Sequence, residues 1–168
     1  MSVSAYFIGT VSGDRRIVVS GTATITLNDT SITGIGTGQP AILLNSGANL
    51  SLNINGNNAL TAGGGAGIQA PTGTTLTIDG NGALSVQGGL SGAGIGGNIS
   101  TAAGNITING GNITATDGTI TATGGSAGGT GIGVGNGLIS LGTVGTISIS
   151  GGSITVNGQA AKRLIQIT

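Results

Sequence analysis

The sequence predicts an all-β fold, a parallel β-solenoid with about three short strands per coil and about five to six coils. Three observations lead to this prediction. Short segments alternate apolar and polar residues, which is the period of a strand and not that of a helix. Asn-Gly, Asp-Gly and Gly-Gly pairs bound these segments as turn signals. The segments also recur along the chain at similar spacings, which is typical of a solenoid.

The composition excludes several other classes of protein. Of the 168 residues, 38 are glycine, 5% are charged and none is cysteine, and the net charge is zero. A mean hydropathy of +0.40 without net charge does not fit a disordered chain. Glycine does not recur at every third position, which excludes collagen, and the lack of cysteine excludes a disulfide scaffold. Because apolar runs such as 41–44 are short, we expect no membrane span.

The first strand of each predicted coil is an apolar, polar, apolar segment followed by a turn. It occurs at residues 25–29, 52–56, 76–80, 106–110 and 147–151. The second apolar residue of each segment is expected to face the axis, which predicts a core ladder of Leu27, Ile54, Ile78, Ile108 and Ile149. These positions lie 27, 24, 30 and 41 residues apart, and the first three spacings suit one coil with three strands and three corners.

Two further alternating pieces follow in most repeats. The second strand is expected at residues 31–33, 59–61, 83–86, 112–115 and 153–156. Its inward residues are predicted to form a second wall of Ile32, Leu60, Leu84, Ile113 and Ile154. A third piece, flanked by glycine, is expected at residues 41–44, 65–68, 92–97 and 131–135. Stacking such coils buries the inward rows, which a single coil cannot do alone.

The residue after each ladder position forms a predicted turn ladder. It consists of Asn28, Asn55, Asp79, Asn109 and Ser150. Short polar side chains at turns hydrogen-bond the local backbone, and stacked asparagines add pairing between coils. We therefore expect a structural role for this column.

The spacing of 41 residues interrupts the repeat. It contains an additional alternating piece at 118–122. Either one coil carries a long excursion, or an irregular extra turn lies between Ile113 and Ile147. The excursion is the favoured interpretation.

The ends of the chain differ from its middle, as the terminal units of a solenoid should. We expect a capping segment with the first strands at 1–21, solenoid repeats at 22–158 and a C-terminal strand or cap at 159–168. The two aromatic residues, Tyr6 and Phe7, lie in a strand-like stretch that is suited to plug the first turn.

All four basic residues also lie near the ends. One hypothesis makes them gatekeepers that keep strand edges from pairing. The other is that Asp14 and Asp29 meet Lys162 and Arg163 of a neighbouring copy, which gives head-to-tail stacking by an interface that does not close. The candidate end-to-end interface consists of Tyr6, Phe7, Asp14, Arg15, Arg16, Lys162, Arg163, Leu164, Ile165 and Ile167.

The residue types that chemistry needs are scarce. The sequence has no Glu, His or Cys, and its four Asp lie far apart, so we expect no enzyme and no catalytic residue. Calcium requires several carboxylates at one place, so we expect no metal and no cofactor. Without a basic stripe and stacking aromatics, we expect no nucleic-acid partner.

The outer side of the first strands is polar and rich in threonine. A flat Thr-rich wall is the surface that an ice-binding solenoid would present, although Thr is also favoured on strand surfaces in general. The expected outward pairs are Thr24 and Thr26, Ser51 and Asn53, Thr75 and Thr77, Asn105 and Thr107, Thr146 and Ser148.

Three segments carry a resemblance to a known family. Residues 73–80, 92–97 and 104–116 resemble the Gly-rich repeats of large bacterial surface proteins, which are often labelled carbohydrate-binding. The resemblance covers roughly Val18 to Gly158. It implies a right-handed parallel β-helix at a bacterial cell surface or in an extracellular fibre.

These observations favour a non-enzymatic structural protein that stacks end to end into an extracellular or cell-surface filament, with itself as partner. The alternatives are a surface adhesin or glycan-binding module and, third, an ice-binding protein. No secretory signal is visible at the start of the sequence, so we expect either that a signal was removed or that export follows another route.

Overall fold

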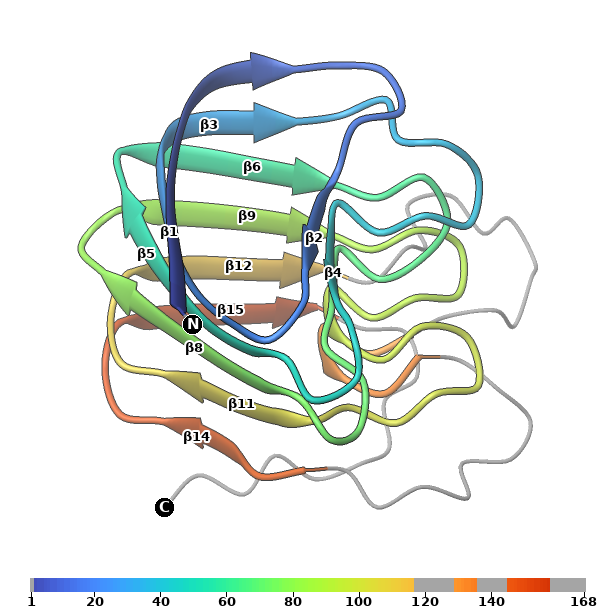
Figure 1. Ribbon diagram of the computed structural model, residues 1–168. Helices are drawn as coiled ribbons and strands as arrows, with labels where there is room; N and C mark the ends of the chain where they lie inside the picture. Colours follow the sequence, from blue (N-terminus) through green and yellow to red (C-terminus); the bar gives the residue numbers. More distant parts are fainter. Residues whose placement is uncertain (1, 117–128, 136–144, 158–168) are drawn as a thin grey trace.

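The computed structural model describes residues 2–116, 129–135 and 145–157. Within these ranges every regular element is a β-strand, and none is a helix (Figure 1). Nor do these ranges contain a helix of the length and hydropathy needed to cross a membrane. The alternating segments bounded by glycine thus form strands, as their period of two requires.

The strands belong to two sheets, of 10 and 5 strands in the described ranges. The larger sheet contains β1 (Ser2–Val11), β3 (Thr22–Ile32), β5 (Asn49–Asn55), β6 (Asn57–Thr61), β8 (Thr75–Gly80), β9 (Ala83–Gln87), β11 (Asn105–Ile108), β12 (Asn112–Thr116), β14 (Ile147–Ile149) and β15 (Ser153–Asn157). The smaller sheet contains β2 (Ile17–Val19), β4 (Ile42–Leu44), β7 (Ile68–Gln69), β10 (Ile95–Gly96) and β13 (Ile132–Gly133). All pairings between these strands are parallel.

The larger sheet is strongly curled because its longest strands turn a corner. The first part of β3 pairs with β5 and its end pairs with β6. Between these parts lies Asp29, whose φ of 49° is left-handed and marks the corner. We call the face made by β5, β8, β11, β14 and the first part of β1 and β3 the first wall. The face made by β6, β9, β12, β15 and the ends of β1 and β3 is the second wall, and the smaller sheet is the third (Figure 1).

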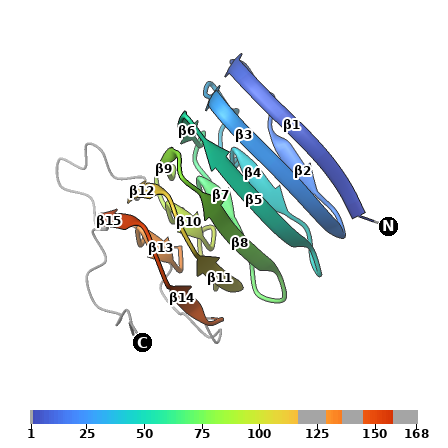
Figure 2. The same ribbon diagram turned by 90° about the vertical axis from the view of Figure 1, so that its left-hand side faces the viewer.

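Successive repeats stack on one another along these walls. Each strand pairs with the strand that occupies the same place in the next repeat, as in the order β2, β4, β7, β10 and β13. Figure 2 shows the repeats as a staircase, with β1 at one end and β14 and β15 at the other. The three walls enclose one aliphatic core. This is a solenoid-like architecture, in which the backbone pairing runs between repeats.

The register corrects the predicted core ladder. Leu27 pairs with Ile54, but Ile54 pairs with Gly80, and Ile78 pairs with Leu52. Ile78 then pairs with Ile108, and Ile108 with Ile149. The five predicted residues therefore occupy two neighbouring rows, and the row that continues through the stack is Ile25, Leu52, Ile78, Ile108 and Ile149.

The difference arises at the corner between the first and second walls. After β5 the chain reaches β6 through Gly56 alone, whereas the turn between β8 and β9 is longer. Gly80 takes the place beside Ile54 with a φ of 113°, and a Cβ there would overlap the backbone oxygen of Ile54. Because no side chain fits at this place, the last inward aliphatic of β8 is Ile78, two residues earlier in register.

The second predicted wall contains the same two-residue difference. Leu60 pairs with Val86, whereas Leu84 pairs with Asn58. Ile113 pairs with Leu84 and with Ile154. The predicted row is therefore split where it passes from β6 to β9.

The third wall carries an isoleucine ladder that the sequence analysis did not name. Its members pair in one register and all lie in the core: Ile17, Ile42, Ile68, Ile95 and Ile132. The four glycine-flanked pieces thus supply one isoleucine each, and Ile17 comes from β2, in the segment predicted to cap the stack.

The long spacing corresponds to a single repeat. β14 pairs directly with β11, and β15 pairs directly with β12. β13 lies in the same repeat as β11 and β12, and it pairs with β10 of the preceding repeat. This register agrees with a long excursion and not with an inserted turn. The additional piece at 118–122 lies outside the described residues.

The isoleucine ladder yields a stability prediction. Ile68 is fully buried in β7, and its neighbour Gln69 is only partly buried. We expect Ile68→Ala to lower the free energy of unfolding by about 2–5 kcal/mol, because it removes apolar contacts and leaves a cavity. Gln69→Ala should stay within about 0.5 kcal/mol of the wild type. Urea unfolding followed by circular dichroism measures both, and equal losses would contradict the ladder.

Candidate functional site

The N-terminal end of the stack presents a long strand edge. In the described part of the chain, β1 pairs with β3 alone and β2 pairs with β4 alone. Natural edge strands are usually short or carry charge or proline, which discourages pairing with another chain. β1 has 10 residues, SVSAYFIGTV, with neither charge nor proline. Its outer edge is therefore suited to receive a further strand.

The inward side chains of β1 form an apolar face at this end. Val3 pairs with Ala23, Ala5 with Ile25 and Phe7 with Leu27, so the three follow the core rows. Leu27 is fully buried, whereas Val3 is 61% exposed and Ala5, Phe7 and Val11 are partly buried against the core. The first repeat thus contacts the core on one side and leaves apolar surface on the other.

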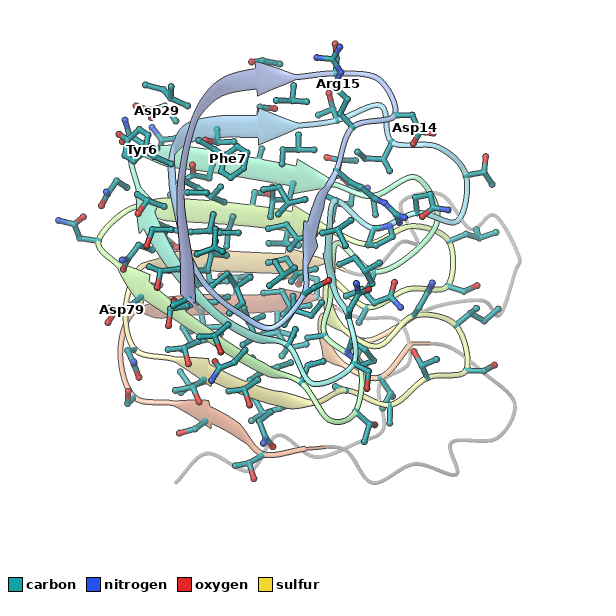
Figure 3. The ribbon with its side chains drawn as sticks, viewed as in Figure 1. Tyr6, Phe7, Asp14, Arg15, Asp29 and Asp79 are labelled. Carbon is teal, nitrogen blue, oxygen red and sulfur yellow. The ribbon has the colours of Figure 1, made fainter. Side chains whose placement is uncertain are left out.

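The two aromatic residues occupy opposite sides of β1. Phe7 packs against the core, and Figure 3 shows it on the inner side of the curled sheet. Tyr6 lies on the outer side of the sheet and is 61% exposed. The expectation that both aromatics plug the first turn is therefore wrong for Tyr6, because neighbouring residues of a strand point to opposite faces.

Two charged residues of the predicted end-to-end interface, Asp14 and Arg16, form hydrogen bonds with loops of the same chain. The Asp14 carboxylate accepts from the backbone N–H of Gly36 at 3.0 Å. The Arg16 guanidinium donates to the Gln39 side-chain oxygen. These bonds link the turn after β1 to the turn after β3. Arg15 is exposed at the same end (Figure 3).

The other predicted interface residues are not part of the described structure. Lys162, Arg163, Leu164, Ile165 and Ile167 lie outside the described residues. The charge pairing proposed between the two ends therefore stays a prediction. Across 2–116, 129–135 and 145–157 no cluster of three potential metal-ligating side chains occurs.

The turn ladder shows the same register change as the core. Asn28 pairs with Asn55, but Asp79 pairs with Asn53. The Asp79 carboxylate accepts from the N–H of Gly80 at 2.7 Å, and the Ser150 hydroxyl donates to the Asn109 side-chain oxygen at 3.1 Å. The predicted column is thus two shorter columns.

The outward column next to the core row begins with Tyr6. Tyr6 pairs with Thr26, Thr26 with Asn53 and Asn53 with Asp79. The neighbouring column contains Ser4, Thr24, Ser51, Thr77, Thr107 and Ser148. The pair Thr75 and Thr77 therefore lies beside Asn49 and Ser51, and the column through Thr77 consists only of Ser and Thr. Ice binding stays a prediction.

A buried polar pair at the corner was missed by the sequence analysis. Asn58 and Thr30 occupy inward positions and are 4% and 1% exposed. The Asn58 side-chain oxygen accepts from the N–H of Thr30 at 2.9 Å, and its amide donates to the carbonyls of Asn55 at 2.8 Å and Ala83 at 3.2 Å. One side chain thereby joins three successive repeats. The signal was available, because Asn58 lies two residues before the inward Leu60.

This pair yields a second stability prediction. Asn58→Ala would remove three hydrogen bonds, each worth about 0.5–1.5 kcal/mol, and the buried N–H of Thr30 would lose this acceptor, which costs about 1–3 kcal/mol more. We expect a loss of several kcal/mol, by the same estimate, in the free energy of unfolding. Asn57→Ala is the matched control, because Asn57 is exposed and only its backbone N–H bonds Asp29. Chemical unfolding of both variants tests this, and an Asn58 variant as stable as the control would refute the role.

No protein-family model matches the chain, and neither a curated protein nor a solved structure matches it. The resemblance to bacterial surface repeats therefore stays a prediction.

Proposed function

We propose that this chain is a right-handed parallel β-helix of about five to six coils that serves as a non-enzymatic building block. In this proposal, copies stack end to end into an extracellular or cell-surface filament. The observation that carries the proposal is the edge of β1, which is long, uncharged and bordered by partly exposed apolar side chains.

Addition of a strand at this edge would both pair the free backbone groups of β1 and bury its exposed apolar side chains. The outward-directed backbone groups of β1 would gain hydrogen-bond partners, as in other cases of β-augmentation. The exposed surface of Val3 and the remaining exposed parts of Phe7 and Val11 would be covered by the next core row. Because apolar burial is the main driving force of association, this face favours a partner with the same row spacing.

The sides of the stack support the same proposal. The outward residues of the first wall are mainly Thr, Ser and Asn, and Asp79 is a charged exception among them. With zero net charge, copies that meet end to end experience little long-range repulsion.

A charge on the apolar end face tests the assembly. Val3→Lys would place an ammonium group in the covered row, and burying an unpaired charge costs several kcal/mol. We expect the protein concentration needed for assembly to rise at least about tenfold, since about 1.4 kcal/mol corresponds to that factor. Light scattering and negative-stain electron microscopy measure it.

Ser4→Lys is the control for this substitution. Ser4 lies on the same strand but on the outer face, so the added charge stays in solvent. This variant should assemble like the wild type. Wild-type protein that stays monomeric at high concentration, or equal effects of the two lysines, would count against end-to-end stacking.

Glycan binding is a second candidate function, favoured by the position of Tyr6. Its exposed ring begins a column that continues with Thr26, Asn53 and Asp79, which offer hydroxyl, amide and carboxylate groups. An aromatic ring with an amphipathic body beside hydrogen-bonding groups is a suitable platform for a sugar. This surface lies on the outer face and is distinct from the apolar end.

Substitution of the ring tests this function. Tyr6→Ala should abolish glycan-array signals, because the platform is lost, and Tyr6→Phe should retain much of the signal. Tyr6 is 61% exposed, so neither change should alter the thermal unfolding midpoint by more than a few degrees. An array on which wild-type protein binds no glycan would exclude this function.

A further inference from the structure

We infer that the partner of β1 is the last described repeat of a second copy, β14 and β15, docked in parallel and in the register that relates successive repeats. The inference rests on the proposed end-to-end assembly and specifies its geometry. In this contact a second copy of the chain covers the apolar end face, and each inward row of one copy continues into the same row of the other.

The rows can be followed from one end of the stack to the other. One runs from Val3 to Ile147, the next from Ala5 to Ile149, and two on the second wall run from Gly9 to Ile154 and from Val11 to Val156. In the proposed contact, the last member of each row in one copy lies beside the first member in the next copy.

The last described repeat also presents apolar surface. Ile147, Ile149 and Ile154 are partly buried, whereas their partners in the preceding repeat, Ile106, Ile108 and Ile113, are fully buried. Both ends of the described stack thus carry incompletely buried members of the same rows.

Of five facing pairs, Val3 with Ile147 and Val11 with Val156 match two aliphatics, as the rows inside the stack do. The other three combine a large residue with a small one. The small Ala5 faces Ile149, and Gly9 faces Ile154. Two residues after Ala5 and Ile149, the large residue is on β1, because Phe7 faces Gly151. A large residue beside a small one can fill the space at such a contact, and matched aliphatics do so in the isoleucine ladder inside the stack.

Other registers lose this complementarity. A shift by two residues that brings Ile149 beside Phe7 also places Gly151 against Gly9 and Gly145 against Val3, so two rows lose the side chain that would fill them. A shift by one residue turns the inward rows of one copy toward the outer face of the other. The register of the repeats is therefore the favoured one.

Disulfide cross-linking tests the register, since the chain contains no cysteine. In the proposed contact, Tyr6 of one copy lies beside Ser150 of the next, at the spacing of neighbouring strands of about 4.8 Å, which a disulfide can span. Within one copy the two residues lie five strand spacings apart, roughly 24 Å, so they cannot be bridged there. Both side chains are exposed, so the double variant Tyr6→Cys with Ser150→Cys should fold.

We expect this variant to form a ladder of covalent oligomers after mild oxidation, visible on a non-reducing gel. The pair Ser4→Cys with Ser148→Cys tests the same register two residues away and should behave alike. The shifted pair Tyr6→Cys with Ser148→Cys should cross-link at least about tenfold less, because its Cα atoms would be separated by more than about 7 Å.

The outcomes separate this inference from the proposed function. Filaments of wild-type protein together with preferential cross-linking of the shifted pair would overturn the register and leave end-to-end assembly intact. Filaments in which no pair cross-links would exclude β14 as the neighbour of β1. Wild-type protein that never assembles would overturn both.

Discussion

Parallel backbone pairing between repeats is the interaction on which the rest of this structure depends. No single repeat encloses a core, because each wall contributes only short strands, down to two residues in β7, β10 and β13. Burial begins when the same row of aliphatics is supported from both sides, as in the ladder of Ile17, Ile42, Ile68, Ile95 and Ile132. The register therefore decides both the hydrogen bonds and the packing, and an error of one residue would exchange the inside and the outside.

The sequence determined more of the strands than of their register. Alternation of apolar and polar residues located the strands from β3 onward, because period two is a local property, but it did not single out β2. The alternation does not show how many residues each corner contains, and this number decides the register of the next strand. The prediction therefore placed Ile54 and Ile78 in one row, although Ile54 pairs with Gly80. Gly80 is required at that corner because the backbone of Ile54, in the adjacent repeat, leaves no space for a side chain. This contact joins residues that are distant in the chain, so a local pattern does not reveal it.

The buried Asn58 shows why a polar group belongs in such a core. Within β5, the inward residues Leu50, Leu52 and Ile54 are similar in shape and polarity, so these side chains alone would tolerate sliding by two residues. Asn58 has no such freedom, because its three hydrogen bonds reach the backbone of Thr30, Asn55 and Ala83 at fixed places. A slipped register would break these three hydrogen bonds, whereas it would exchange one aliphatic contact for a similar one. The loss of the hydrogen bonds is therefore the larger cost. The corner thus fixes the register where the aliphatic rows alone leave it ambiguous.

The two proposed functions use opposite faces of the same strand and therefore do not compete. On β1, Phe7 and Val3 belong to two of the inward rows that stacking would cover, whereas Tyr6 belongs to the outer column. In an in-register stack the Tyr6 ring would recur once per copy along one side of the filament. A weak contact at one ring would then be multiplied along a rigid array, since linked sites bind with high effective concentration when their spacing is fixed. Assembly would in this way supply the affinity that a single exposed aromatic ring cannot provide.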